Sequence, residues 1–318
     1  MPGAIAHMAA VRQAQARLVA EYGATLIAEC ADQHPAWLHA GSIAPDYSDL
    51  YQILSRGHPD KWSCLLHQEK SGDAIRAGVA WINDHIKGRS SPEFQRSVAW
   101  LAGYLSHIVL DATIHPVVHA IVGEYDLNWV DHRHCEMVMD AHICNRNGGF
   151  SEVMATWERA LLQTSDEAGE GIDLAIKSIW SYMLEKTYPA AYADNPPALD
   201  GWHHDCQQGI ASAHQEGVLF KYATPATANH YRRRGALPED ASLIYIENCP
   251  APANNRFGRD TMHFDEIFRF GIGNMIRYWL QLEDALTSGD AELPDLPNWN
   301  LDHGRIDTYT KGDAALWT

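Results

Sequence analysis

Hydrophobic residues recur at helical spacing through most of the chain, and turn residues separate the resulting segments. The clearest helix start lies at Ser91, a capping serine followed by Pro92 at the first helical position and Glu93 in the first turn. The apolar run that follows reaches Pro116, where the helix should kink or end because proline disfavours helical geometry in the residue before it. The same reasoning predicts further helices over 5–31, 73–86, 130–146, 151–164, 170–188, 207–222 and 265–288.

Two regions break the helical pattern. Gly41 and Pro45 mark a loop over 34–50, in which Asp46 is either a turn former or a carboxylate delivered to a site. Residues 190–260 are rich in proline and asparagine and predict a loop-rich insertion, with a short strand over 242–248. The predicted fold is therefore mainly α, a single helical bundle domain over 1–290, followed by an extended polar tail over 291–318.

Length, composition and net charge limit the classes to which the protein can belong. The chain has 318 residues, of which 46% are hydrophobic and 20% charged, as is typical of a soluble globular protein. A net charge of −17 disfavours binding to nucleic acid or stable anchoring on an anionic membrane, since both require a basic surface. No run approaches membrane-spanning length and no leader is evident, so we expect a cytoplasmic protein. The six cysteines form no CxxC pair, which favours free thiols.

A row of polar residues interrupts the most apolar helix. Its members are spaced by four, so each lies about 40° from the last on one helix face, and the full row spans about 18 Å. That length excludes a single shared metal ion but fits adjacent ions. A carboxylate buried among apolar residues is costly unless a cation compensates its charge, and metals such as zinc take imidazole and carboxylate together. The row consists of His107, Asp111, His115 and His119.

The following helix repeats the spacing of four in His132, Glu136 and Asp140. The chain has 18 histidines against 24 lysines and arginines, an excess that fits a metal protein. The sequence alone therefore predicts a metal site with more than one ion, built between these two helices.

These motifs resemble the bacterial zinc-dependent phospholipase C family. The likeness lies in GSIAPDY (41–47), His67, GYLSHIVLDATIHP (103–116) and the pair His132 and Glu136. It covers roughly residues 5 to 150, with a weaker match in helical layout beyond. The resemblance implies an all-helical fold, distantly similar to fungal single-strand-specific nucleases, and a cluster of two or three zinc ions.

The resemblance also implies ligands for each ion. One zinc would be bound by Asp46, His67, His107 and Asp111, and a second by His115, His132 and Glu136. His7, with Asp111 as a bridge, would bind a third. His119 competes with His115 for the second ion. His134 and Asp140 are further ligands or partners for the second ring nitrogen of a ligand histidine. Asp46 would also serve as the catalytic general base.

The leading hypothesis for function is a metal-dependent hydrolase of a small phosphate ester, most simply a phosphodiester, because zinc makes a water nucleophilic near neutral pH. A second hypothesis keeps the metal site but changes the substrate to an amide, ester or lactone of a biosynthetic pathway. A third is a non-catalytic module stabilised by metal. The eleven tryptophans and thirteen tyrosines could line a pocket for a quaternary amine, but core packing is their expected role.

Overall fold

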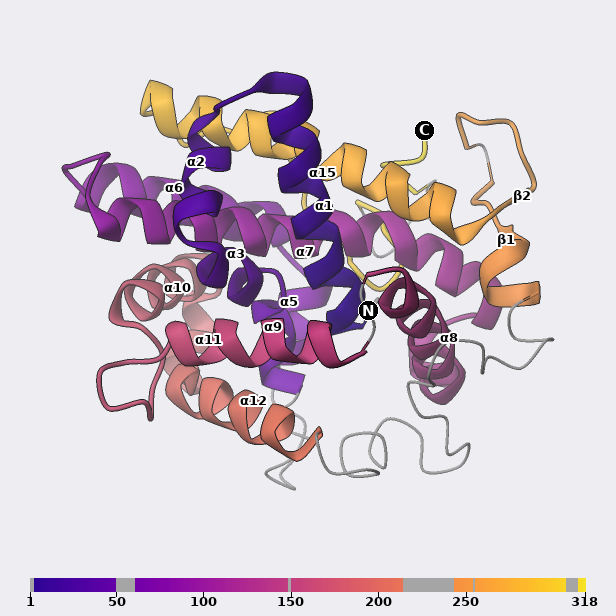
Figure 1. The fold of residues 1–318 in the computed structure, drawn as a ribbon, viewed down its shortest axis with the longest axis horizontal. Coiled ribbons are helices and arrows are strands. Elements are labelled where there is room, and N and C mark those ends of the chain that lie inside the picture. The colour runs from indigo at the N-terminus through magenta and orange to yellow at the C-terminus, as the bar shows by residue number, and fades with distance from the viewer. Residues whose placement is uncertain (1–2, 50–60, 148–149, 214–242, 254, 307–313) are drawn as a thin grey trace.

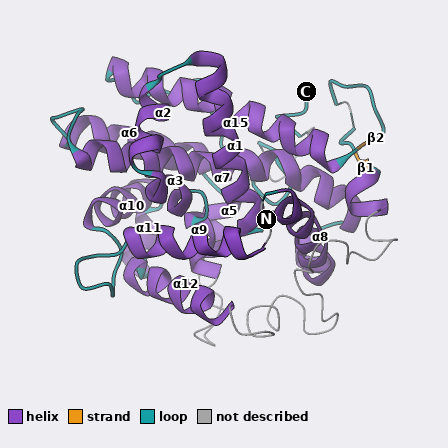
Figure 2. Ribbon diagram, in the orientation of Figure 1, coloured by secondary structure: helices purple, strands orange, loops and turns teal. Residues whose placement is uncertain are grey.

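Helix α7, Pro92–Val122, runs through the centre of the molecule, and several other helices pack against it (Figure 1). The computed structural model describes all residues except 1–2, 50–60, 148–149, 214–242, 254 and 307–313. Every residue of α7 from 97 to 118 is buried, which explains why the helix is apolar on all sides. Figure 2 shows that helices dominate the described chain, so the mainly α prediction is confirmed.

The expectation that no segment reaches membrane-spanning length was wrong. By length and composition alone α7 could cross a membrane, since its most apolar window has a mean hydropathy of 1.4. However, 78% of that window is buried inside the protein, and a central core helix passes the same test.

The start of α7 is as predicted, because the Ser91 hydroxyl accepts a hydrogen bond from the Phe94 amide and Pro92 opens the helix. Of the two outcomes predicted at Pro116, a kink or an end, the end is excluded, since the helix continues to Val122. The C-terminal tail packs against this part of the helix. The Trp317 indole donates to the Thr113 carbonyl at 2.8 Å.

The N-terminal segment forms two helices rather than the single one predicted over 5–31. Helix α1 spans Ala4–Tyr22 and α2 spans Leu26–Gln33. Gly23 ends α1 with a φ of 78°, a conformation that glycine adopts without strain. Thr25 then caps α2 by accepting from the Ala28 amide. Apolar residues continue at helical spacing across Gly23, so the sequence pattern did not reveal the end of α1.

The segment predicted as a loop over 34–50 is partly helical. Helix α3 spans Pro35–Gly41 and a single 3₁₀ turn, η1, spans Ala44–Asp46. Helix α3 crosses α7 with two glycines at the contact. A Cβ on Gly41 would lie 2.1 Å from the Trp100 carbonyl oxygen, and one on Gly103 would lie 2.2 Å from that of Leu38. Only glycine permits this approach, which sets η1 beside the polar row of α7.

This close crossing predicts a large difference between two glycines in helix interiors. Gly103→Ala should destabilise the protein by about 3 kcal/mol, because the added methyl meets backbone atoms that cannot yield. Gly273→Ala in α15 is the matched control, since its Cβ would have only Arg17 Nη1 nearby, at 3.6 Å. Gly273→Ala should increase the free energy of unfolding by about 0.5–1 kcal/mol, because alanine has a higher helix propensity than glycine. Urea denaturation measures both, and equal effects would contradict the glycine crossing.

The middle of the chain follows the predicted helices closely. These are α6 (Ser71–His85), α8 (Tyr125–Arg146), α9 (Phe150–Gln163) and α10 (Leu174–Thr187). Helix α5 (Lys61–Gln68), which carries His67, was not predicted. Aromatic side chains fill the spaces between them, as expected for core residues. The fully buried tryptophans are Trp62, Trp100, Trp180, Trp202, Trp279, Trp299 and Trp317.

In the described part of the region 190–260, helices α11 (Pro189–Asp194) and α12 (Leu199–Ala213) come first. The predicted helix over 207–222 falls within α12 up to Ala213, and its remainder lies outside the described residues. The predicted strand over 242–248 was wrong, since Leu243–Glu247 forms one π-helical turn, η2. Strand pairing begins just after it, between β1 (Cys249–Pro250) and β2 (Thr261–Met262).

The last helix, α15 (Phe264–Ser288), packs alongside α7 (Figure 1). His263 and Glu266 cap its start reciprocally, and Gly289 ends it as predicted. The described part of the following tail packs against α6 and α7 through buried side chains, among them Trp299, Leu301 and Trp317.

A buried histidine next to η1 predicts a pH dependence of stability. His203 is fully buried, contacts the Ser165 hydroxyl at 3.2 Å, and has its pKa lowered to about 4 by burial. The unfolded chain binds this proton near pH 6.5 and the folded chain does not, so stability falls as the pH drops from 6.5 toward 4. His203 should therefore contribute a loss of about 2 kcal/mol between pH 7 and 5.

Urea denaturation at both pH values would measure this effect. His203→Gln should reduce the loss by that amount, whereas His204→Gln, a change at an exposed neighbour, should leave it unchanged. An unaltered pH dependence in His203→Gln would contradict the interpretation.

Candidate metal centre

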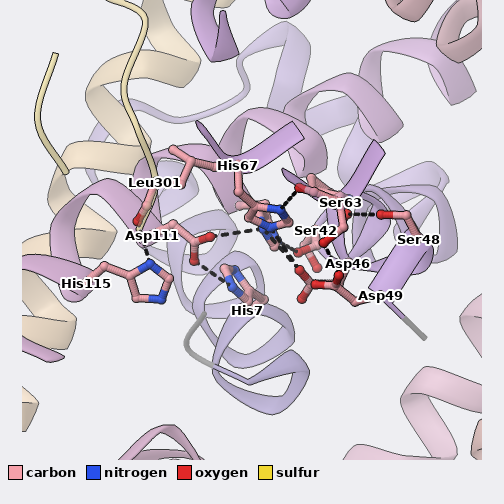
Figure 3. Close-up of polar contacts among 12 residues, drawn as sticks. His7, Ser42, Asp46, Ser48, Asp49, Ser63, His67, Asp111, His115 and Leu301 are labelled. Atoms are coloured by element: carbon pink, nitrogen blue, oxygen red, sulfur yellow. Dashed lines mark hydrogen bonds and ion pairs between the residues drawn. The ribbon is translucent and has the colours of Figure 1, made fainter. Parts of the chain in front are cut away.

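Four elements bring one group of imidazoles and carboxylates together beside the middle of α7 (Figure 3). His107 and Asp111, one turn apart on α7, place Nε2 and Oδ2 3.2 Å from each other. His7 of α1 lies on the other side, with its Nε2 3.1 Å from Asp111 Oδ1 and its ring stacked on His107 at 4.1 Å. Asp46 of η1 places Oδ1 3.3 Å from Nε2 of His67, which lies on α5.

Backbone carbonyls fix the direction of two of these rings. His107 Nδ1 donates to the Ser42 carbonyl at 3.0 Å, and His67 Nδ1 donates to the Ser63 carbonyl at 2.8 Å. Because Nδ1 carries the proton in both rings, Nε2 is left to face the carboxylates. Ser42 directly follows α3, so the glycine crossing that positions α3 also orients His107.

A second group lies one turn further along α7. Its members are His115 of α7 and His132 and Glu136 of α8. Glu136 Oε1 lies 3.4 Å from His115 Nε2 and 3.0 Å from His132 Nε2. His115 Nδ1 donates to the Leu301 carbonyl, and Arg133 Nη1 lies 3.3 Å from the other oxygen of Glu136.

The burial of the polar atoms in the first group tests whether that group fits a metal. In the first group, several buried atoms make no hydrogen bond within the described residues: both ring nitrogens of His7, Nε2 of His67 and His107, Oδ1 of Asp46 and both oxygens of Asp111. Burying them is costly unless a cation lies between them. Imidazole nitrogens and carboxylate oxygens are the ligands that zinc prefers, so the residues fit zinc.

The electrostatics of the first group are those of a tightly coupled set. Burial alone would raise the pKa of Asp111, but the charges of His107, His115 and His7 outweigh it and hold this pKa well below its usual range. Burial alone would likewise lower the pKa of His67, but Asp46 raises it to about 10. The first group therefore keeps Asp111 ionised, as a metal ligand must be.

Three predicted residues lie apart from both groups. His119 extends toward Glu124 instead, with Nε2 3.2 Å from Oε1, so His115 is the residue that meets the second group. The His134 ring packs edge-on against Tyr245 at 5.6 Å. Asp140 accepts from the Ala6 amide at 3.0 Å, and so holds the start of α1, the helix that carries His7.

Sequence reasoning missed Asp49. Its carboxylate accepts a hydrogen bond from the Ser63 hydroxyl and offers an oxygen within 4.8 Å of ligand atoms of Asp46 and His67. Burial raises the pKa of this half-buried side chain. The available signal was the spacing of three from Asp46. Sequence reasoning also missed the Leu301 carbonyl, for which no signal exists because every residue carries one.

All six cysteines are free, as predicted. Cys135, between His134 and Glu136, is buried, and burial raises the pKa of its thiol. It is absent from both groups and packs in the core.

Comparison with protein families gives one match. The model of the zinc-dependent phospholipase C family matches residues 6–189, more than half of the chain. The chain belongs to the zinc-dependent phospholipase C family. The match includes every predicted ligand of the two groups and His7, and ends before the segment that holds Leu301. This membership supports zinc as the metal and a zinc hydrolase as the class of protein. No curated protein and no solved structure matched the chain.

Proposed function

We propose that this member of the zinc-dependent phospholipase C family is a hydrolase that uses two or three zinc ions to cleave a small phosphodiester. The first zinc would be bound by Asp46, His67, His107 and Asp111, and the second by His115, His132 and Glu136. His7 and Asp111 would hold a third. The observation that carries this proposal is the set of buried imidazole and carboxylate atoms of the first group that make no hydrogen bond within the described residues, in a chain of this family.

Zinc, when bound, would lower the pKa of water and offset the charge of a phosphate ester. The protein residues would do the rest. Asp46 is the proposed base because its side chain is 11% exposed, whereas that of Asp111 is fully buried. The Asp46 carboxylate would accept the proton of the attacking water, and the Ser63 carbonyl would keep His67 turned toward Asp46.

The proposed substrate is a small molecule. The net charge of −17 would repel a polyanion such as nucleic acid over most of the surface. A single phosphodiester group carries little charge by comparison, and bound zinc would reverse the potential at the site itself.

Zinc content and product analysis together test the proposal. Protein purified without added metal or a histidine tag should contain two or three zinc ions per chain by elemental analysis. It should release a phosphomonoester from at least one member of a panel of lipid, nucleotide and synthetic phosphodiesters. Zinc-stripped protein is the control.

Other results would contradict the proposal. If the protein hydrolyses only members of an amide, ester or lactone panel, the proposed zinc centre would stand but the proposed phosphodiester substrate would be wrong. Zinc without turnover of either panel would favour a module that zinc only stabilises.

A further inference from the structure

One short segment after α15 connects the two groups of the metal centre. We call residues 299–304 the C-terminal strap. The Leu301 amide donates to the His67 carbonyl at 2.6 Å, and the Leu301 carbonyl accepts from His115 Nδ1. A single residue of the strap thus contacts one histidine from each group. Figure 3 shows Leu301 next to the His115 ring.

The strap is held in place on both sides of Leu301. The Trp299 amide donates to the Ser71 hydroxyl at 2.9 Å, and this hydroxyl contacts the Trp299 carbonyl at 3.1 Å. On the other side, Gln68 Nε2 donates to Asp302 at 2.9 Å. Trp299 and Leu301 are buried. The strap is therefore part of the core and bonded to α5 and α6, the helices on either side of residue 69.

The strap also lies directly against α7 where Pro116 interrupts its hydrogen bonds. Pro116 has no N–H, so the Ala112 carbonyl lacks its usual helical donor. Gly304 fits closely here, with a φ of 68°. A Cβ at this position would lie 2.4 Å from the Ala112 oxygen and 2.6 Å from Cγ of Pro116. The lack of a side chain at Gly304 sets how closely the strap approaches the turn that carries His115.

We propose that the C-terminal strap positions the second zinc group, with Leu301 as the positioning residue for His115. The inference rests on the proposed function, because it requires that this group binds zinc. A carbonyl bonded to Nδ1 fixes the ring and its tautomer and makes Nε2 a better ligand. Nε2 of His115 then faces Glu136, 3.4 Å away. The strap lies outside the residues matched by the family model, so the family match does not assign it this role.

The test uses two full-length variants in which the substituted residue has a similarly unfavourable backbone conformation. Gly304→Ala and Gly289→Ala both place a methyl group at a positive φ, 68° and 79° respectively. A Cβ on Gly289 has nothing within 4 Å, whereas one on Gly304 would displace the strap from α7. Zinc bound per chain is measured by elemental analysis across a series of chelator concentrations. Melting of the zinc-free proteins is measured alongside.

Gly304→Ala should bind one zinc about 10–100-fold more weakly than the wild type and retain the rest, because a lost partner of a ligand histidine has an effect of this size. Gly289→Ala should bind all its zinc as the wild type does. Zinc-free Gly304→Ala should melt below zinc-free Gly289→Ala, because only its added methyl meets atoms of α7, so zinc binding is compared at a temperature at which both variants are folded. Unchanged zinc affinity in Gly304→Ala, or equal weakening of every ion, would overturn the positioning role.

The wild type separates this inference from the proposed function. If the wild type binds two or more zinc ions and Gly304→Ala retains them all, only the positioning role fails. If the wild type binds fewer than two, the proposed metal centre fails and the strap inference fails with it. If Gly304→Ala does not fold, Ser71→Ala replaces it, because this change removes both contacts to Trp299 while leaving α7 untouched. Ser178→Ala, at an exposed hydroxyl bonded to the Leu174 carbonyl, is its control.

Discussion

Replacing Asp111 by asparagine should remove zinc and activity more completely than any other single change at the metal centre. Asp111 is fully buried and lies 3.1 Å from His7 and 3.2 Å from His107. Neither of its oxygens makes a hydrogen bond to a described residue. Asparagine keeps the volume but loses the negative charge that offsets the cations. We expect fewer than one zinc per chain and a fall in hydrolysis of about 10³-fold or more, equal to about 4 kcal/mol of transition-state stabilisation.

Two further variants test whether the loss of zinc is specific to Asp111. Glu136→Gln should lose only the ion of the second group, since Glu136 lies beside His115 and His132 of that group. Asp265→Asn, at a carboxylate that pairs with His142 and Arg146 away from the centre, should retain all zinc. Full zinc occupancy in Asp111→Asn would refute the central role of this carboxylate.

Removing the metal with a chelator should both abolish hydrolysis and destabilise the fold. Each ion bound only by the folded state stabilises it by about 4 kcal/mol when its concentration is a thousand times its Kd. For two or more ions, we expect the melting temperature to fall by about 10 °C or more. Without zinc, the carboxylates of Asp46 and Asp111 stay buried among histidines that must then bind protons instead.

Differential scanning calorimetry and a diester assay measure both effects in the same sample. Added zinc should restore the melting temperature and the activity together, whereas magnesium, which prefers oxygen ligands, should restore neither. A chelated protein that melts as before and remains active would contradict a zinc-dependent role. Restored melting without any activity would favour a metal-stabilised module.

Local rules explain the parts of the fold that sequence predicted well. The Ser91 and Pro92 start of α7, the glycine end of α15 and the helices from α6 to α10 depend on neighbouring residues, which the sequence shows directly. The failures also have physical causes. Gly23 ended a helix within a continuous apolar pattern, and packing carried α7 through Pro116.

The sequence by itself determined which residue types could bind metal and which of them share a helix face. A spacing of four brings His107 to Asp111 and His132 to Glu136 whatever the rest of the fold does. The ligand roles drawn from this spacing and from the family resemblance stay predictions.

Only the tertiary structure decided which distant residues join those pairs. His7, Asp46 and His67 come from three separate elements, and the glycine crossing of α3 over α7 brings Asp46 to His107. The choice of His115 over His119 depends on where α8 lies, and the Leu301 carbonyl reaches His115 from 186 residues away. Spacing along one helix is fixed by its pitch, whereas contacts between helices depend on the packing of the whole chain.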